Sequence, residues 1–299
     1  MSRLDATALR PVTPADRRAF TAHVERHTPL SCEYNFLNFL CWSKLYDNQW
    51  AEAPGRLYLH DNVSGNLLMP LGEDVTVEEL RQCSRELAAH GRGAKIALVP
   101  DAFMAANPQV RELFDIEREE DFGDYIYSVR KMFELKGEKL HKKRNLVSQF
   151  QRLHPDHQVV PARPLLDECL ALAERLNRAL DSETAVEELA ALREVFSNFD
   201  AAGAEALALT VKGRLVAFTV FSRQSPALYV THFEKADHEF KGATQAMTQA
   251  TAAFLLDKCE LVNREQDLGI PGLRKAKRSY CPELLHMTSL LTPKPGAAL

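Results

Sequence analysis

The densest group of polar side chains lies between residues 261 and 282, in the stretch LVNREQDLGIPGLRKAKRSYCP. Carboxylates and phenols can exchange protons with a substrate, and a fixed cation can polarise a carbonyl or bind an anion. Glu265 and Asp267 are candidate bases here, and Tyr280 is a candidate acid. The candidates for binding substrate are Asn263, Arg264, Arg274, Lys275 and Lys277. The alternative is an internally paired structural loop followed by a solvated basic helix.

A second group of candidates lies in THFEKADHEF, residues 231–240. His232 and Glu234 are two residues apart on a predicted strand, so they are expected on the same face of the sheet. If that face lines a cleft, Glu234 is an acid–base candidate and His232 a further acid–base or substrate-binding candidate. The alternative is a half-buried histidine paired with glutamate. Gly242 follows, and its backbone amide and the next two could bind an anion at a helix start, or it could be a turn residue.

A third group is the basic stretch of residues 135–155, LKGEKLHKKRNLVSQFQRLHP. Its apolar residues fall on one face of a predicted helix, and five cations occupy nine positions against one acid. The cations expected to neutralise phosphates of tRNA or of a lipid head group are Lys139, Lys142, Lys143 and Arg144. A solvated helix between two domains is the alternative interpretation.

The pattern of predicted elements indicates how these residues are positioned. In the second half, three antiparallel strands within 205–236 precede a helix over 240–258. A strand at ELVN, a helix at GLRKAKRSY and a final strand at LHMTSLL follow, which is typical of a mixed α+β sheet. The first half has a shorter version that ends in a strand at 124–129. We therefore expect an N-terminal domain (1–134), a basic linking helix (135–156) and a C-terminal domain with the active cleft (157–299).

Composition limits the possible functions. The chain has 299 residues, 45% of them hydrophobic, which favours two domains, and a net charge of −4, which excludes a cationic field over the whole protein. Six scattered cysteines without a Cys-x-x-Cys motif predict neither disulfides nor a metal site. The first twenty residues do not read as a secretory signal, and no apolar run approaches the ~18 residues that span a bilayer. We expect a cytoplasmic protein.

Four segments carry a family resemblance, and they are SCEYNFLNFLCW (31–42), KLHKKRNLVSQF (139–150), HFEKADHEFKGATQAMTQ (232–249) and VNREQDLGIPGLRKAKRSY (262–280). In this order they resemble soluble bacterial relatives of the C-terminal domain of phosphatidylglycerol lysyltransferase. The resemblance implies two tandem GNAT-like (N-acetyltransferase-like) domains, related to the Fem peptidyltransferases. In characterised relatives, an aminoacyl-tRNA donates its amino acid to a hydroxyl or amine acceptor.

Together these features predict a transferase that uses aminoacyl-tRNA and no cofactor, with a small molecule or a lipid head group as acceptor. The first alternative is an N-acyltransferase that uses acyl-CoA, whose pyrophosphate would rest on the amides around Gly242. The second is a binding module that holds a ligand without turnover. The oligomeric state and the role of the first domain are left open by the sequence.

Overall fold

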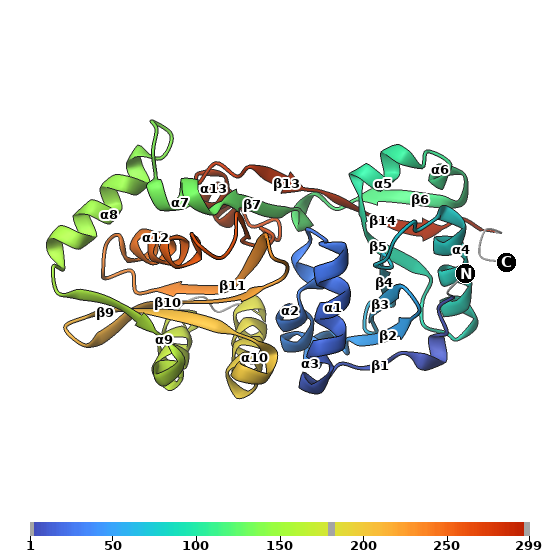
Figure 1. Ribbon diagram of the computed structural model, residues 1–299, viewed down its shortest axis with the longest axis horizontal. Coiled ribbons are helices and arrows are strands. Elements are labelled where there is room, and N and C mark those ends of the chain that lie inside the picture. Colours follow the sequence, from blue (N-terminus) through green and yellow to red (C-terminus); the bar gives the residue numbers. More distant parts are fainter. Residues whose placement is uncertain (1–2, 179–182, 296–299) are drawn as a thin grey trace. The chain divides into compact units, whose positions relative to one another are not determined.

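The computed structural model describes residues 3–178 and 183–295, and it divides into two compact units (Figure 1). One unit holds the chain up to Asp124 together with the residues from His286 onward, and the other holds Tyr125–Leu285. Each unit is built on a seven-stranded mixed sheet. None of the helices in the described ranges is both long enough and apolar enough to cross a membrane.

The first unit has the strand order β1-β2-β3-β4-β5-β14-β6. The strands are β1 (Arg10–Pro11), β2 (Gln49–Ala53), β3 (Arg56–Asp61), β4 (Asn66–Leu68), β5 (Lys95–Pro100), β6 (Phe114–Arg118) and β14 (Thr288–Pro293). The main helices are α1 (Arg17–His27), α2 (Phe36–Cys41) and α4 (Val77–Ala89). Helix α4 begins where the Thr76 side chain accepts from the Glu79 amide, a normal N-cap. Its buried stripe consists of Val77, Leu80, Cys83, Ser84 and Leu87, at the spacing typical of one helical face.

The second unit has the strand order β13-β7-β12-β11-β10-β9-β8. The strands are β7 (Asp124–Ser128), β8 (His157–Pro161), β9 (Glu205–Val211), β10 (Arg214–Arg223), β11 (Leu228–Ala236), β12 (Leu261–Asn263) and β13 (Leu284–His286). The helices that matter here are α7 (Val129–Glu134), α8 (His141–Leu153), α9 (Leu166–Asn177), α10 (Glu183–Ser197), α12 (Ala243–Leu255) and α13 (Pro271–Arg278). Figure 1 shows α12 on one face of this sheet and α9 and α10 on the other.

The hairpin strands and the helix after them confirm the prediction for residues 205–258. Strands β9, β10 and β11 pair antiparallel, and β12 then pairs parallel to β11. That parallel pairing covers only three residue pairs, from Leu228 opposite Leu261 to Val230 opposite Asn263. Beyond them the two strands have no further paired residues, so their ends are free to part.

The last strand of each expected domain belongs to the sheet of the other unit, which corrects the expected domain boundaries. The strand at 124–128 pairs with β12 of the second unit, and the strand at 288–293 lies between β5 and β6 of the first. The predicted linking helix is also part of the second unit, where α8 packs against α12. Buried strands such as Tyr125–Tyr127 are apolar in either sheet, so their local pattern does not reveal which sheet they join.

Candidate functional site

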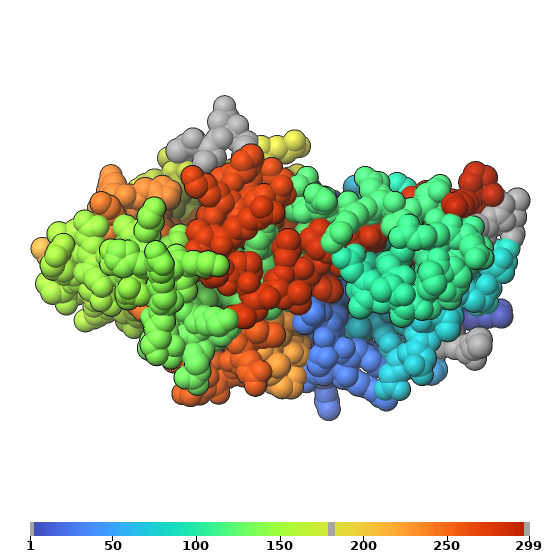
Figure 2. Space-filling view, turned by 90° about the horizontal axis from the view of Figure 1, so that it is seen from above, coloured from blue at the N-terminus to red at the C-terminus, as the bar shows by residue number. Residues whose placement is uncertain are grey.

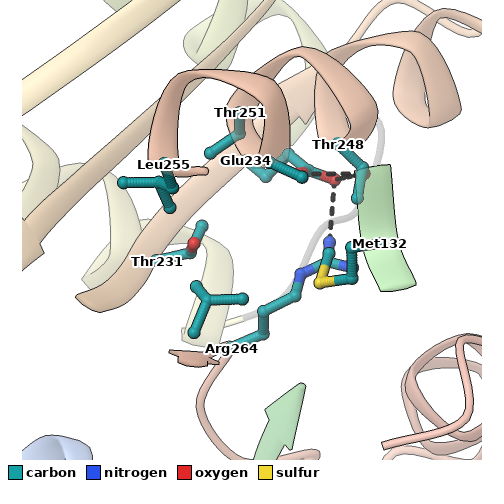
Figure 3. Close-up of a pocket in the computed structure, with 9 residues that line it drawn as sticks. Met132, Thr231, Glu234, Thr248, Thr251, Leu255 and Arg264 are labelled. Carbon is teal, nitrogen blue, oxygen red and sulfur yellow. Dashed lines mark hydrogen bonds and ion pairs between the residues drawn. The ribbon is translucent and has the colours of Figure 1, made fainter. Parts of the chain in front are cut away.

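The candidate site lies in the second unit where β11 and β12 part (Figure 3). A narrow cavity of about 10 Å³ lies there, and all its lining residues belong to the second unit. Strand β11, the end of β12, helix α12 and helix α7 line it. The lining residues are Met132, Thr231, Glu234, Thr248, Thr251, Ala252, Leu255, Val262 and Arg264.

An ion pair crosses the gap between the strands. Arg264 Nη2 donates to Glu234 Oε1 at 3.0 Å, and the two side chains are 15% and 12% exposed. Thr248 Oγ1 of α12 lies 3.1 and 3.2 Å from the two carboxylate oxygens of Glu234. Figure 3 shows the three side chains meeting at one end of the cavity. Burial lowers the pKa of Arg264, but Glu234 and two neighbouring phenols outweigh it, so the net shift is upward and the guanidinium stays charged.

Aromatic rings and a lysine surround this guanidinium. Its carbon lies 5.2 Å from the ring centroid of Tyr280 and 5.9 Å from that of Tyr127, distances typical of cation–π contacts. Lys143 of α8 places Nζ 4.4 Å from the Tyr280 centroid. Burial and the nearby Arg264 lower the pKa of Lys143, and Glu234 only partly offsets this. The cluster therefore holds two cations against one carboxylate, an arrangement that favours an incoming anion or a polarised oxygen.

The hydroxyl of Tyr280 is the most available proton donor of this cluster. The residue is 7% exposed, and its Oη is buried next to Thr248 and Gln245 without a hydrogen bond of normal geometry. Burial raises the pKa of Tyr280, so the phenol remains protonated at neutral pH. The predicted acid thus lies beside the ion pair with its proton not committed elsewhere.

Asp267 and Arg274 lie outside the cavity lining and support the loop instead. Arg274 donates from Nε and Nη2 to the two oxygens of Asp267, each at 2.8 Å. Tyr125 Oη at 2.7 Å and the Gly269 amide at 3.0 Å donate to the same carboxylate. The Arg274 hydrogen bonds lead the causes that lower the pKa of Asp267 to about 2, against an opposing burial effect. The interpretation of an internally paired loop therefore suits Asp267, whose partner is Arg274.

The other three candidate binding residues within residues 261–282 also lie outside the cavity lining. Lys277 Nζ donates to the backbone carbonyls of Arg264 and Glu265, so it holds the loop below the guanidinium. Asn263 is fully buried, and its side-chain oxygen accepts from the Glu265 amide at 2.7 Å. Lys275 is exposed on α13 and does not line the cavity. Of the predicted binding residues in this stretch, the structure brings only Arg264 into the cavity wall.

The prediction that His232 and Glu234 share a face is wrong. The pairing of β10 and β11 passes from Val220 opposite Phe233 to Phe221 opposite Thr231, so His232 is the extra residue of a β-bulge. Glu234 contacts Thr248 of α12. Phe221 also faces α12, so the next residue, Ser222, points to the other face of the sheet. His232 contacts Ser222 and therefore lies on that other face. A bulge interrupts strict alternation, and residue spacing does not reveal it.

On that other face, His232 bridges two side chains. Its Nδ1 lies 2.9 Å from Glu265 Oε1 and its Nε2 lies 2.8 Å from Ser222 Oγ, with the histidine side chain 1% exposed. An ionised carboxylate only accepts hydrogen bonds, so Nδ1 donates to Glu265. Glu265 itself has φ of 58°, uncommon for a residue other than glycine. Its side chain thus turns away from the cavity that Arg264 enters.

Gly242 is explained by packing between helices. Its φ is 91°, and a Cβ at this position would lie 2.4 Å from the carbonyl oxygen of Leu146 and 3.0 Å from Cβ of Phe150, both on α8. The Ala243 amide already donates to the Phe240 carbonyl. Because α8 covers the start of α12, the close approach that Gly242 permits is to α8. The anion-binding site expected at this helix start is therefore a wrong prediction.

The basic stretch contributes one side chain to the cluster. Lys143 is half-buried over Tyr280, whereas Arg144 Nη1 donates to the Leu135 carbonyl at 2.7 Å beyond the end of α7. Lys139 and Lys142 are exposed. Figure 2 shows the red residues after β12 at the surface beside the light green residues of α8. The exposed lysines therefore extend the cationic character of the cluster outward.

Sequence reasoning missed three contributors to the site: Thr248, Tyr127 and Met132. A detectable signal existed for Thr248, because Thr244, Thr248 and Thr251 form a polar stripe at helical spacing on the mostly apolar α12. Thr248 and Thr251 donate to the carbonyls four residues earlier, at 2.9 and 3.0 Å. For Tyr127 and Met132 there was no signal, because both read as ordinary core residues.

The two mixed sheets, with parallel strands that part beside a helix, define a tandem GNAT-like protein. A family model described as phosphatidylglycerol lysyltransferase, C-terminal, matches residues 17–290. The chain therefore belongs to this family, as its four motifs indicated. A search of curated protein sequences finds no match to it.

Solved structures agree with this assignment. A conserved protein of unknown function from Bacteroides thetaiotaomicron is 29% identical, with a TM-score of 0.90 over 96% of this chain and 99% of that one. The C-terminal domain of a proposed lysylphosphatidylglycerol synthetase from Agrobacterium fabrum is 13% identical, with a TM-score of 0.66 over 96% and 95%. The L-PGS structure from Bacillus licheniformis is 15% identical, with a TM-score of 0.64 over 95% and 93%. At such identities, the last two matches establish the shared fold.

Proposed function

We propose that this protein is an aminoacyltransferase that moves an amino acid from aminoacyl-tRNA to a hydroxyl or amine acceptor. Membership of the phosphatidylglycerol lysyltransferase C-terminal family supports acyl or aminoacyl transfer in general. The observation that carries the proposal is the Glu234–Arg264 pair, which lies beside a protonated buried phenol where β11 and β12 part. This set contains a carboxylate, a fixed cation and an acid, and it requires no nucleophile from the protein.

The three side chains divide the work of the reaction. Among the described residues, Arg264 pairs only with Glu234, through Nη2, so its other N–H groups remain to polarise the ester carbonyl of the donor. Glu234 takes the proton of the acceptor as its oxygen or nitrogen attacks that carbonyl. Tyr280 gives its proton to the ribose oxygen as the ester bond breaks. Thr248, which contacts Glu234 and lies beside Tyr280, is placed to return the proton from Glu234 to the phenolate.

The surroundings favour a tRNA donor over acyl-CoA. The start of α12, where this fold would hold a pyrophosphate, is covered by α8 and lacks room even for a methyl group at Gly242. Lys143 reaches the cluster from α8, and Lys139 and Lys142 continue from it at the surface. Such a short row of cations suits the phosphates near the acceptor end of a tRNA, and an overall charge of −4 would limit binding elsewhere.

A transfer assay tests this function directly. The purified protein is incubated with radiolabelled aminoacyl-tRNA and, in separate reactions, phosphatidylglycerol vesicles or a soluble amine. We expect labelled product that depends on both protein and acceptor, and a loss of about 10²-fold in kcat for Arg264→Gln. Arg152→Gln, which removes an exposed cation from α8 outside the cluster, is the matched control. Product formed only from acyl-CoA, or tRNA binding without any transfer, would refute the proposal.

A further inference from the structure

We infer that the cavity between β11 and α12 receives the side chain of the donor's amino acid and selects a small uncharged one over lysine. This inference rests on the proposed function and assigns its donor class. The cavity adjoins the Glu234–Arg264 pair at which the donor carbonyl would lie. The donor's side chain, attached at the carbon next to that carbonyl, would therefore lie beside this cavity.

Charge is the first reason for the selection. The nine lining residues include one acid and one base, and these two already pair with each other. Both oxygens of Glu234 also lie within hydrogen-bond distance of Thr248. A lysine ammonium in the cavity would face the Arg264 guanidinium and find no second carboxylate on the lining. Burying an unpaired charge next to a like charge is strongly unfavourable.

The nearest other acids do not supply the missing charge. Asp267 is held by Arg274 from two nitrogens and by the Tyr125 hydroxyl, and its side chain is 2% exposed. Glu265 contacts His232 on the opposite face of the sheet. An ammonium in the cavity would thus remain unpaired without a rearrangement of one of these networks.

Size and polarity are the second reason. The cavity, of about 10 Å³, is narrow and has room for about one water molecule. Its apolar wall consists of Met132, Ala252, Leu255 and Val262, and the hydroxyls of Thr248 and Thr251 donate to helix carbonyls. Such a cavity suits a methyl or hydroxymethyl group. A longer chain would have to displace α12 or Met132.

Competition between two donors tests the inference. Alanyl-tRNA and lysyl-tRNA are compared by their kcat/KM values with the wild-type chain. In parallel, calorimetry measures binding of hydrolysis-resistant alanyl and lysyl amides of 3′-amino-adenosine. We expect the alanyl compounds to be favoured by at least about 10-fold in both measurements. Equal or better use of the lysyl compounds would overturn the inference.

Two variants make the test specific to the cavity. Thr251→Asp adds a carboxylate to the lining and should shift the ratio toward the lysyl donor by at least about 10-fold. Thr244→Asp, on the same helix but outside the lining, should leave the ratio unchanged. If Thr251→Asp does not fold, Met132→Ala is used instead. It shortens a side chain of the lining, so the enlarged cavity should accept the side chain of a leucyl donor. An unchanged ratio in a folded lining variant would show that the side chain binds elsewhere.

The two measurements separate failure of the inference from failure of the function. Selective binding of the alanyl amide without transfer to any acceptor would contradict the aminoacyltransferase proposal and leave the selectivity of the cavity intact. Transfer with a lysyl preference would support the function and overturn the selectivity. If the protein neither binds the alanyl amide nor transfers an amino acid, both the function and the selectivity are overturned.

Discussion

Arg264 Nη2 lies 3.0 Å from Glu234 Oε1, although Glu234 lies on β11, Arg264 directly follows β12, and these parallel strands pair over only three positions. The ion pair therefore spans the gap that this pairing leaves. It also links the opening stretch of residues 261–282 to the segment around residue 234, which are separate in the sequence.

Glu234→Gln and Arg264→Gln should each destabilise the protein by about 3 kcal/mol, because each leaves a nearly buried charge without its partner. The double variant should cost at least about 1 kcal/mol less than the sum of the two single changes. Urea unfolding of the four proteins gives this coupling directly. Strict additivity would mean that the two side chains do not interact in solution.

Tyr280→Phe and Tyr127→Phe should separate proton donation from stability. The Tyr280 hydroxyl has no hydrogen bond of normal geometry, so its removal should change the unfolding free energy by less than about 1 kcal/mol. If this hydroxyl protonates the leaving oxygen, kcat for transfer should nevertheless fall by about 10²-fold. Tyr127 Oη donates to the Lys277 carbonyl at 2.9 Å, so Tyr127→Phe should cost about 1 kcal/mol instead. An unaltered kcat for Tyr280→Phe would remove Tyr280 from the chemistry.

Asp267→Asn should lower stability in a way that depends on pH. The folded pKa of Asp267 is about 2, below its ordinary value of 3.8. A carboxylate with a lowered pKa stabilises the fold above about pH 4 and loses this contribution as pH falls toward 2. The difference between wild type and Asp267→Asn should therefore be about 2 kcal/mol at pH 7 and shrink below pH 4.

Unfolding in urea across this pH range provides the measurement for Asp267. Asp200→Asn is the matched control, because Asp200 forms an exposed pair with Arg163 at 2.7 Å. It should have little effect on stability at any pH. A difference for Asp267→Asn that stays constant down to pH 2 would contradict the assigned role of its carboxylate.

Gly242→Ala should destabilise the second unit far more than Gly137→Ala. The two glycines have nearly the same φ, 91° and 90°, so both substitutions carry similar backbone strain. Only at Gly242 would the new Cβ meet backbone, 2.4 Å from the Leu146 carbonyl oxygen, whereas the space at Gly137 is open. We expect about 1 kcal/mol for Gly137→Ala and at least about 3 kcal/mol for Gly242→Ala in thermal or urea unfolding. Equal effects would show that α8 does not cover the start of α12.

Much of the fold was predictable from local sequence. The hairpin strands of residues 205–236, the helix after them and the stripe of α4 all follow from apolar periodicity and turn residues. The candidate site was predicted in part. Glu234, Arg264, Tyr280 and Lys143 were all named from their residue types, and the structure brings them into one cluster.

Two errors have a common physical origin. His232 was placed with Glu234 because alternation was assumed to continue, and a bulge breaks it. The strands at 124–128 and 288–293 were each assigned to the nearer domain in the sequence, and each joins the other sheet. In both cases the outcome depends on backbone pairing with a distant strand, which the side chains of the segment itself do not encode.

Packing with distant elements also decided which residues of the 261–282 stretch support the loop and which enter the site. Residue types in the 261–282 stretch were sufficient to predict a charged, hydrogen-bonded segment. Long-range contacts decided that Arg264 enters the cavity, that Asp267 pairs with Arg274, and that Lys277 binds backbone carbonyls. Periodicity acts within one element and can be read along the chain. The partner of a charged side chain is set by which elements pack together, and only the folded chain settles that.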